Sequence, residues 1–153
     1  MLDPSGYDAG KKIKGRKRHI LVDTLGLLLN VAVHPADIQD RNGAALVLDE
    51  RTRHLFPFIE RIYTDGGYQG PRVRDAAART GTWKVEIVKR CDIAKGFVVL
   101  PKRWIVERTL AWISRNRRLA RDFERYARTG AAFVRLAMIR IMLRRLTKPN
   151  HSI

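Results

Sequence analysis

The stretch from Ile20 to Val33, ILVDTLGLLLNVAV, decides the fold of this chain. Two runs rich in apolar and β-branched residues flank a short connection that contains Gly26, and this pattern is typical of a β-hairpin. The second run is almost continuously apolar, as in a strand that is covered on both faces. The sequence therefore predicts a hairpin whose second strand lies inside a sheet.

Helix and strand patterns alternate after the hairpin. A helix capped by Asp40 or Asn42 is expected to continue through residue 50. An apolar run then predicts a buried strand over residues 59–64.

The second half of the chain continues this alternation. A helix is expected from Pro71, where the missing backbone N–H costs nothing, to Gly81. Residues 83–90 alternate apolar and charged side chains, which predicts a half-exposed edge strand. Two long helices complete the pattern, over about 102–126 and about 129–146, the second capped by Thr129. The order β-β-α-β-α-β-α-α predicts a single α/β domain over residues 1–153 with one mixed sheet.

The charge of the chain predicts a polyanionic partner. Lys and Arg outnumber Asp and Glu by 31 to 15, which gives a net charge of +16 and an isoelectric point near 11.0. The cations are spread along the chain, which favours a nucleic-acid-binding fold over a neutral domain with a basic arm. A membrane surface is the competing partner, and nucleic acid is favoured over it. The densest run, residues 10–19, is expected to be an extended arm or a loop that contacts phosphate. Its predicted DNA contacts are Lys11, Lys12, Lys14, Arg16, Lys17 and Arg18.

Other features of the composition point to the cytoplasm. The single Cys91 excludes an internal disulfide and a Cys-based zinc site. The chain opens without an apolar leader, and its most apolar late stretch, residues 131–146, carries four arginines that argue against a membrane span.

Two acids, Asp65 and Glu107, lie in settings that favour metal chemistry. Asp65 ends an apolar run and precedes GGYQG at 66–70, so it is expected at a strand end, where α/β sheets place ligands. The glycines allow a sharp turn and the close approach of a substrate. Glu107 lies in a basic helical segment. Carboxylates placed in this way can hold hard cations around a scissile phosphate, although Asp65-Gly66 can also be a simple turn.

The surroundings of the two acids leave alternatives open. On one long helix, Arg103 and Arg118 fall on the Glu107 face and could grip phosphate oxygens. The alternative is an ion pair between Arg103 and Glu107 on a solvated face. Tyr68 either stacks on a base or sugar, or covers the edge of the sheet.

Three motifs follow one another along the chain: GYDAGKKIKGRKRH at residues 6–19, just before the hairpin, TDGGYQG at 64–70 and RWIVERT at 103–109. Together they resemble the bacterial insertion-sequence transposases of the IS5 group, which are IS4-like, and the resemblance covers essentially the whole chain. It implies a DDE transposase with an RNase H-like core and two Mg²⁺ ions, with Mn²⁺ as a substitute.

The resemblance also implies partners and residue roles. The DNA substrate carries terminal inverted repeats and is joined to target DNA, which places the protein at the bacterial nucleoid. Asp65 corresponds to the second catalytic acid and Glu107 to the third, so both are metal ligands. Arg103 corresponds to the basic residue that grips DNA near the cut.

Two departures from the family pattern qualify this interpretation. The family has a basic residue seven places after the catalytic Glu, where this chain has Ser114, and we expect Arg115 or Arg118 to substitute. The family's first catalytic Asp lies on a core strand upstream of the first motif. Asp3 and Asp8, in a lead-in rich in Pro and Gly, and Asp23, at the hairpin turn, are poor replacements.

We therefore expect the C-terminal catalytic part of such a transposase, without its first core strand and first Asp. It would be a downstream reading frame or a remnant, with little activity alone, and would form a homodimer or pair with an upstream-frame product. One alternative is a non-catalytic DNA-binding remnant or regulator that pairs with an intact transposase. A basic RNA-binding protein is disfavoured because no aromatic-rich recognition strand is present.

Overall fold

The computed structural model describes residues 5–79, 81, 83–88 and 102–147, without the side chain of Arg103. Cys91 and the end of the strand predicted over 83–90 lie outside the described residues. No described helix is both long enough and apolar enough to cross a membrane.

The first sheet contains three antiparallel strands, β1 (Gly6–Asp8), β2 (Ile13–Val22) and β3 (Leu28–Pro35), in the order β1-β2-β3. The predicted hairpin is confirmed by β2 and β3, which pair with Ile20 opposite Val31. Asp23 organises the turn between them, because its carboxylate accepts hydrogen bonds from the backbone N–H groups of residues 25 and 27.

The prediction of an arm or loop over residues 10–19 is wrong for most of the segment. Residues 13–19 belong to β2, whose backbone pairs first with β1 and then with β3. Mutual repulsion does not expel the basic side chains of this strand, because several of them have partners inside the fold.

The second sheet contains two parallel strands, β4 (Arg61–Thr64) and β5 (Lys84–Ile87). The prediction of one mixed sheet is therefore only partly right, since strands of both orientations occur but in separate sheets. A 3₁₀ turn, η1 (Gly66–Tyr68), follows β4. Helix α3 (Pro71–Arg79) begins at Pro71 as expected.

The helix predicted through residue 50 is two helices, α1 (Asp40–Val47) and α2 (Glu50–Leu55). The first has Gln39 at its N-cap, so neither predicted capping residue holds that position. The helical path is interrupted before Asp49. The Asp49 carboxylate accepts hydrogen bonds from the Thr52 backbone N–H at 2.8 Å and from the Thr52 hydroxyl at 2.6 Å. This N-cap starts a new helix.

The helix predicted over 102–126 is also shorter than expected. It is α4 (Arg103–Ser114), followed by the 3₁₀ turn η2 (Arg117–Leu119). The side-chain amide of Asn116 donates to the carbonyl oxygens of residues 112 and 113, and this satisfies acceptors that the next helical turn would otherwise use. The last helix, α5 (Ala127–Leu146), begins after an N-cap at Tyr126, not at Thr129.

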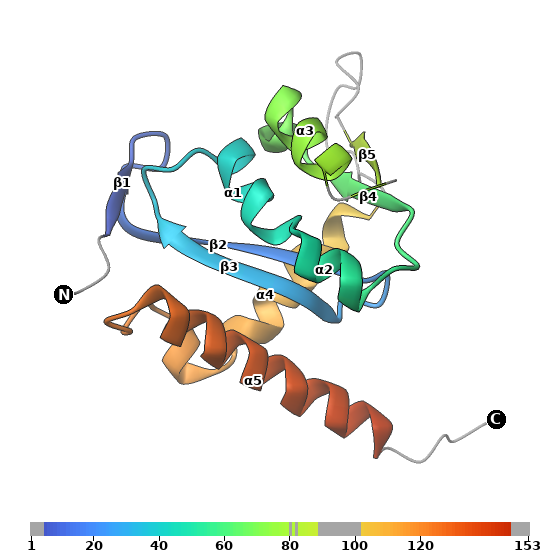
Figure 1. Cartoon of the computed structure of the whole chain (residues 1–153). Coiled ribbons are helices and arrows are strands. Elements are labelled where there is room, and N and C mark those ends of the chain that lie inside the picture. The colour runs from blue at the N-terminus through green and yellow to red at the C-terminus, as the bar shows by residue number, and fades with distance from the viewer. Residues whose placement is uncertain (1–4, 80, 82, 89–101, 148–153) are drawn as a thin grey trace, which may run out of the picture.

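The helices cover both faces of the β2–β3 hairpin (Figure 1). Figure 1 shows α1 and α2 on one side of it and α4 and α5 on the other. Two hydrophobic clusters follow from this arrangement. Val31 packs with residues of α4 and α5, whereas Ala32 packs against the cluster of α1, α3, β4 and Trp83. The prediction that the second hairpin strand is covered on both faces is confirmed.

A small polar clamp joins the hairpin turn to α4. The hydroxyl of Thr109, which is 0% exposed, donates to the Gly26 carbonyl oxygen at 2.8 Å. Arg108 donates to the Leu25 carbonyl oxygen at 2.8 Å, and its guanidinium stacks on Trp104 and Trp112. The turn approaches α4 this closely because Gly26 has a φ of +78° and no side chain.

We expect Gly26→Ala to lower the free energy of unfolding by about 1–3 kcal/mol. The added Cβ would lie 2.7 Å from the Thr109 hydroxyl oxygen, in a backbone conformation that alanine disfavours. Urea denaturation measures the change. Gly15→Ala is the matched control, because a Cβ there meets no heavy atom within 4 Å. Equal stability of the two variants would contradict the clamp.

Candidate active site

Asp65 is the first residue after β4 and caps the following 3₁₀ turn. Its carboxylate accepts a hydrogen bond from the Gly67 backbone N–H at 2.9 Å, and the side chain is exposed. A Cβ added to Gly66 would meet no heavy atom within 4 Å, so the turn that follows Asp65 has open space at Gly66. The predicted position at the end of a strand is confirmed, and so is the turn.

Glu107 lies on the exposed side of α4. The opposite side, through Ile105 and Thr109, is buried and attaches the helix to the hairpin, as the predicted helix face implies. Glu107 and Asp65 line the same cavity, which has a volume of about 670 Å³. The fold therefore brings the two predicted acids to one space.

Two strand edges form much of the wall of this cavity. Residues 16–21 of β2 and residues 62–64 of β4 line it, together with residues of α1 and α4. Beyond its pairing with β1 at residues 13–15, β2 has a described strand partner only on its β3 side, and the one described partner of β4 is β5. The cavity thus lies between two strand edges that have no partner strand within the described part of the chain.

Three of the predicted DNA contacts have partners inside the fold. Arg16 forms an ion pair with Asp122 at 3.2 Å, and its side chain is 8% exposed. Lys17 bridges Asp8 at 3.2 Å and Asp40 at 3.3 Å. Arg18 donates to the Leu119 carbonyl oxygen at 2.8 Å. These contacts tie β2 to α1 and to the η2 region, a role that the sequence did not indicate.

The other cations of the segment are exposed. Lys11, Lys12 and Lys14 lie at the turn between β1 and β2 and at the start of β2, with their side chains in solvent. Asp8 holds this turn, because its carboxylate accepts hydrogen bonds from the backbone N–H groups of residues 10 and 11 at 3.0 and 3.1 Å. The Lys11 backbone N–H and then the Lys17 ammonium group lower the pKa of the Asp8 carboxyl. The described geometry leaves these three lysines available to a polyanion.

Arg115 and Arg118 do not share one helix face with Glu107, because α4 ends at Ser114. Arg118 forms an ion pair with Glu124 at 2.6 Å and lies over the Phe133 ring. Arg115 is exposed. Arg103 was predicted either to grip DNA or to pair with Glu107. Its side chain lies outside the part of the structure that is described, so both remain predictions.

Tyr68 is anchored by a buried pair of histidines that the sequence reasoning missed. Its hydroxyl and His19 Nδ1 are hydrogen bonded at 2.6 Å, and the His19 ring stacks on His34 with centroids 4.6 Å apart. Burial, followed by the charges of Asp40 and Asp65, raises the pKa of Tyr68. The prediction that Tyr68 covers part of the sheet agrees with this packing. The sequence signal for the pair was that His19 directly precedes, and His34 directly follows, the apolar stretch of the predicted hairpin.

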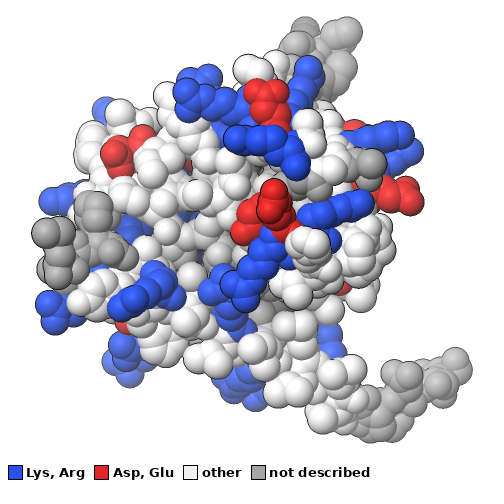
Figure 2. All heavy atoms as spheres, viewed as in Figure 1, with Lys and Arg blue, Asp and Glu red and all other residues white. Residues whose placement is uncertain are grey.

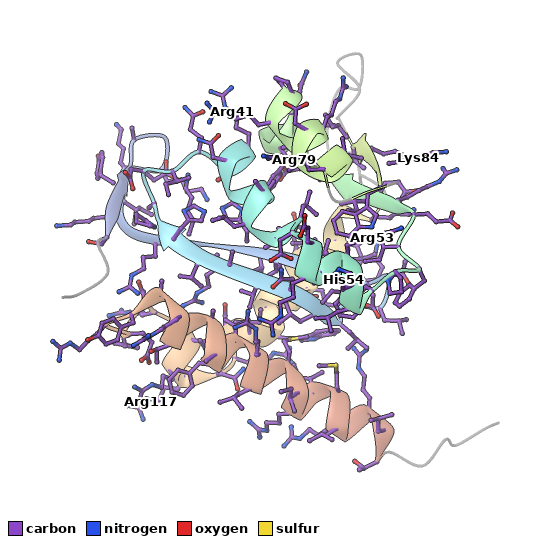
Figure 3. The ribbon with its side chains drawn as sticks, in the orientation of Figure 1. Arg41, Arg53, His54, Arg79, Lys84 and Arg117 are labelled. Carbon is purple, nitrogen blue, oxygen red and sulfur yellow. The ribbon has the colours of Figure 1, made fainter. Side chains whose placement is uncertain are left out.

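The basic surface is broad (Figure 2). In this view Lys and Arg are scattered over the molecule, with a few Asp and Glu among them. The labelled basic side chains Arg41, Arg79 and Arg117 come from three different elements, α1, α3 and η2 (Figure 3). Within residues 5–79, 81, 83–88 and 102–147, no group of three His, Cys, Asp or Glu side chains could hold a metal ion.

Comparison with known proteins identifies related sequences. A family model described as "Transposase DDE domain" matches residues 3–142. A Burkholderia cepacia protein named "Putative transposase for insertion sequence element IS402" is 30% identical over 145 residues; the match covers 91% of this chain and 68% of that protein. No solved structure matches the chain.

The buried histidine pair predicts a stability that depends on pH. Burial, with a further contribution from His34, lowers the pKa of His19 to about 4, whereas unfolded histidine titrates near 6.5. Between these values the unfolded chain binds the proton and the fold does not. The contribution of neutral His19 to the free energy of unfolding is therefore complete above about pH 6.5. It is lost as the pH falls toward 4, which lowers the free energy of unfolding by roughly 3 kcal/mol. Urea denaturation at a series of pH values measures it.

Two variants separate His19 from the other titrating groups. His19→Gln should show a weaker pH dependence across this range, whereas His54→Gln, at an exposed position, should behave as the wild type does. An unchanged pH dependence in His19→Gln would contradict the assignment.

Proposed function

The chain belongs to the family of transposase DDE domains, and we propose that Asp65 and Glu107 are two acids of a divalent-metal site that cleaves and joins insertion-sequence DNA. The transposase would be of the IS5 group, with an RNase H-like core. The observation that carries this proposal is the shared cavity. Asp65 and Glu107, far apart in the sequence, line one space in a chain that matches the family over residues 3–142.

The two carboxylates suit a hard cation, because Mg²⁺ and its substitute Mn²⁺ prefer oxygen ligands. Asp65 is held by the Gly67 N–H, which accounts for one lone pair and leaves others for a ligand. A divalent cation in such a site activates the attacking hydroxyl and stabilises the leaving oxygen. The chain's own residues contribute oxygen ligands and their fixed positions on β4 and α4.

A further carboxylate is needed to complete this site. Among the described residues, the edges of β2 and β4 that face the cavity have no strand partner, and an extended segment between them would join the two sheets into one. We place the family's first strand and its Asp in this position, from another part of the transposase or from a second chain. The isolated chain would then be inactive.

DNA binding follows from the exposed cations. Lys11, Lys12 and Lys14 extend from one end of the first sheet, and Arg115 lies just beyond α4. Arg16, Lys17 and Arg18 instead serve the fold through their internal contacts. The DNA would be the ends of the insertion sequence and the target, so the protein would be found at the nucleoid.

A second candidate function is a non-catalytic regulator that binds DNA and pairs with an intact transposase. The observation in its favour is that the described residues contain no three-ligand cluster. The two candidates differ at Asp65 and Glu107, which the regulator would not need. Metal binding therefore distinguishes them.

We expect the purified chain to bind Mn²⁺, as measured by electron paramagnetic resonance, and Asp65→Asn or Glu107→Gln to weaken binding by about tenfold or more. Each change removes a charged oxygen ligand without changing the shape of the side chain. Asp75→Asn is the matched control, because Asp75 is an exposed acid on α3. Equal Mn²⁺ binding by all four proteins would favour the regulator.

Cleavage of supercoiled plasmid DNA in Mg²⁺ or Mn²⁺ tests the need for a further acid. The chain alone should cleave no more than its Asp65→Ala variant. Clean cleavage that Asp65→Ala abolishes would show that the chain carries a complete site, and would contradict the incomplete one proposed here.

Replacing Lys11, Lys12 and Lys14 together by Gln should weaken binding to duplex DNA and reduce its salt dependence by about two to three counterions, because each lysine neutralises one phosphate. Fluorescence anisotropy over a range of salt concentrations measures both quantities. Replacing Arg51, Arg79 and Lys84 by Gln controls for the loss of three charges, because these exposed cations lie on α2, α3 and β5 and not at the β1–β2 turn. Equal effects of the two triple variants would contradict a DNA contact at the β1–β2 turn.

A further inference from the structure

The last helix has a second apolar face that the fold does not use. Its inner face packs against β3 through Ala131, Val134, Ala137 and Met138. Its outer face carries four large aliphatic residues. Leu136, Ile139, Leu143 and Leu146 are 59%, 45%, 55% and 81% exposed.

These four residues form one stripe along the helix. At about 100° per residue they fall within an arc of about 80°, on the side of α5 opposite its buried residues. Their spacing of three, four and three residues is that of a seam between two helices. The arc is narrower than the apolar face with which a helix typically packs on a core or lies on a membrane. The shape of the stripe therefore fits one partner helix.

The borders of the stripe are positively charged. Arg140 and Arg144 lie along one side, and α5 contains no Asp or Glu. Arg135 lies on the other side, where its guanidinium donates to the Val31 carbonyl oxygen of β3 at 3.4 Å. Among the described residues, no ion pair involves Arg140 or Arg144. Along α5, at the bottom of the view, Figure 2 shows uncharged surface with Lys and Arg beside it.

This charge pattern selects the kind of partner. Pairing two copies of α5 would place the arginines of one copy beside those of the other, in chains that each carry a net charge of +16. A helix with acidic residues beside its apolar seam would instead oppose each arginine with a carboxylate.

We propose that the outer face of α5 is a docking surface for an acidic amphipathic helix of a partner protein. Leu136, Ile139, Leu143 and Leu146 form the apolar seam, and Arg140 and Arg144 select the charge of the partner. The surface lies on α5, away from Asp65 and Glu107, so this inference is independent of the proposed catalytic function.

The test uses the full chain and three synthetic helical peptides of equal length. The first has Leu at the seam positions and Glu beside them, the second has Lys in place of Glu, and the third is the first with its residues scrambled. Isothermal titration calorimetry at physiological salt should detect binding of the Glu peptide alone. Equal binding of the scrambled peptide would show attraction by net charge only and would overturn the proposal.

Variants locate the binding on α5. Ile139→Gln combined with Leu143→Gln should weaken binding at least about tenfold, whereas Leu46→Gln combined with Leu55→Gln, at exposed apolar positions elsewhere, should leave it unchanged. Because all four side chains are exposed, circular dichroism should show the wild-type fold in each variant. Unchanged affinity of the α5 variant would overturn the proposal.

A charge exchange tests the role of the arginines. The chain that carries both Arg140→Glu and Arg144→Glu should no longer bind the Glu peptide and should bind the Lys peptide instead. Two other results would assign the face to a different occupant and overturn the proposal. One is self-association of the wild type, by light scattering, that Ile139→Gln and Leu143→Gln abolish. The other is binding to vesicles of anionic lipid that the same changes abolish.

Discussion

The hydrogen bond between Thr109 and Gly26 is the contact on which the arrangement of the site depends. It joins a fully buried hydroxyl on α4 to the turn of the central hairpin, and Arg108 adds a second bond to the same turn. With Thr109 held inward, Glu107 faces outward on the same helix, into the cavity that Asp65 also lines. The local geometry of one turn thus sets where an acid on a distant helix lies.

Much of the positive charge of this chain serves the fold itself. Arg16 and Arg18 link β2 to the η2 region, Lys17 links β2 to α1, and Arg118 pairs with Glu124. Such contacts leave fewer cations for a nucleic acid than the net charge of +16 implies. The exposed lysines at the β1–β2 turn and the arginines bordering α5 are then distinct surfaces, one suited to phosphate and the other to an acidic helix.

Several elements could be predicted because their signals are local. The hairpin, the strand before Asp65 and the start of α3 follow from runs, turns and a proline that act within a few residues. Helix lengths were predicted less well. The Asp49 carboxylate caps the start of α2, and the Asn116 amide bonds carbonyl oxygens at the end of α4. These side chains replace backbone hydrogen bonds of a longer helix, and the spacing of apolar residues does not reveal such a replacement.

The sequence by itself determined that this is a basic α/β chain with Asp65 after a strand, Glu107 on a helix and the motifs of a transposase family. Only the tertiary structure decided that the two acids share a cavity, that the described strands form two separate sheets on either side of it, and that His19 and His34 stack beside Tyr68. The physical reason is that these relations depend on how buried faces pack across the chain, whereas the sequence signals act between near neighbours.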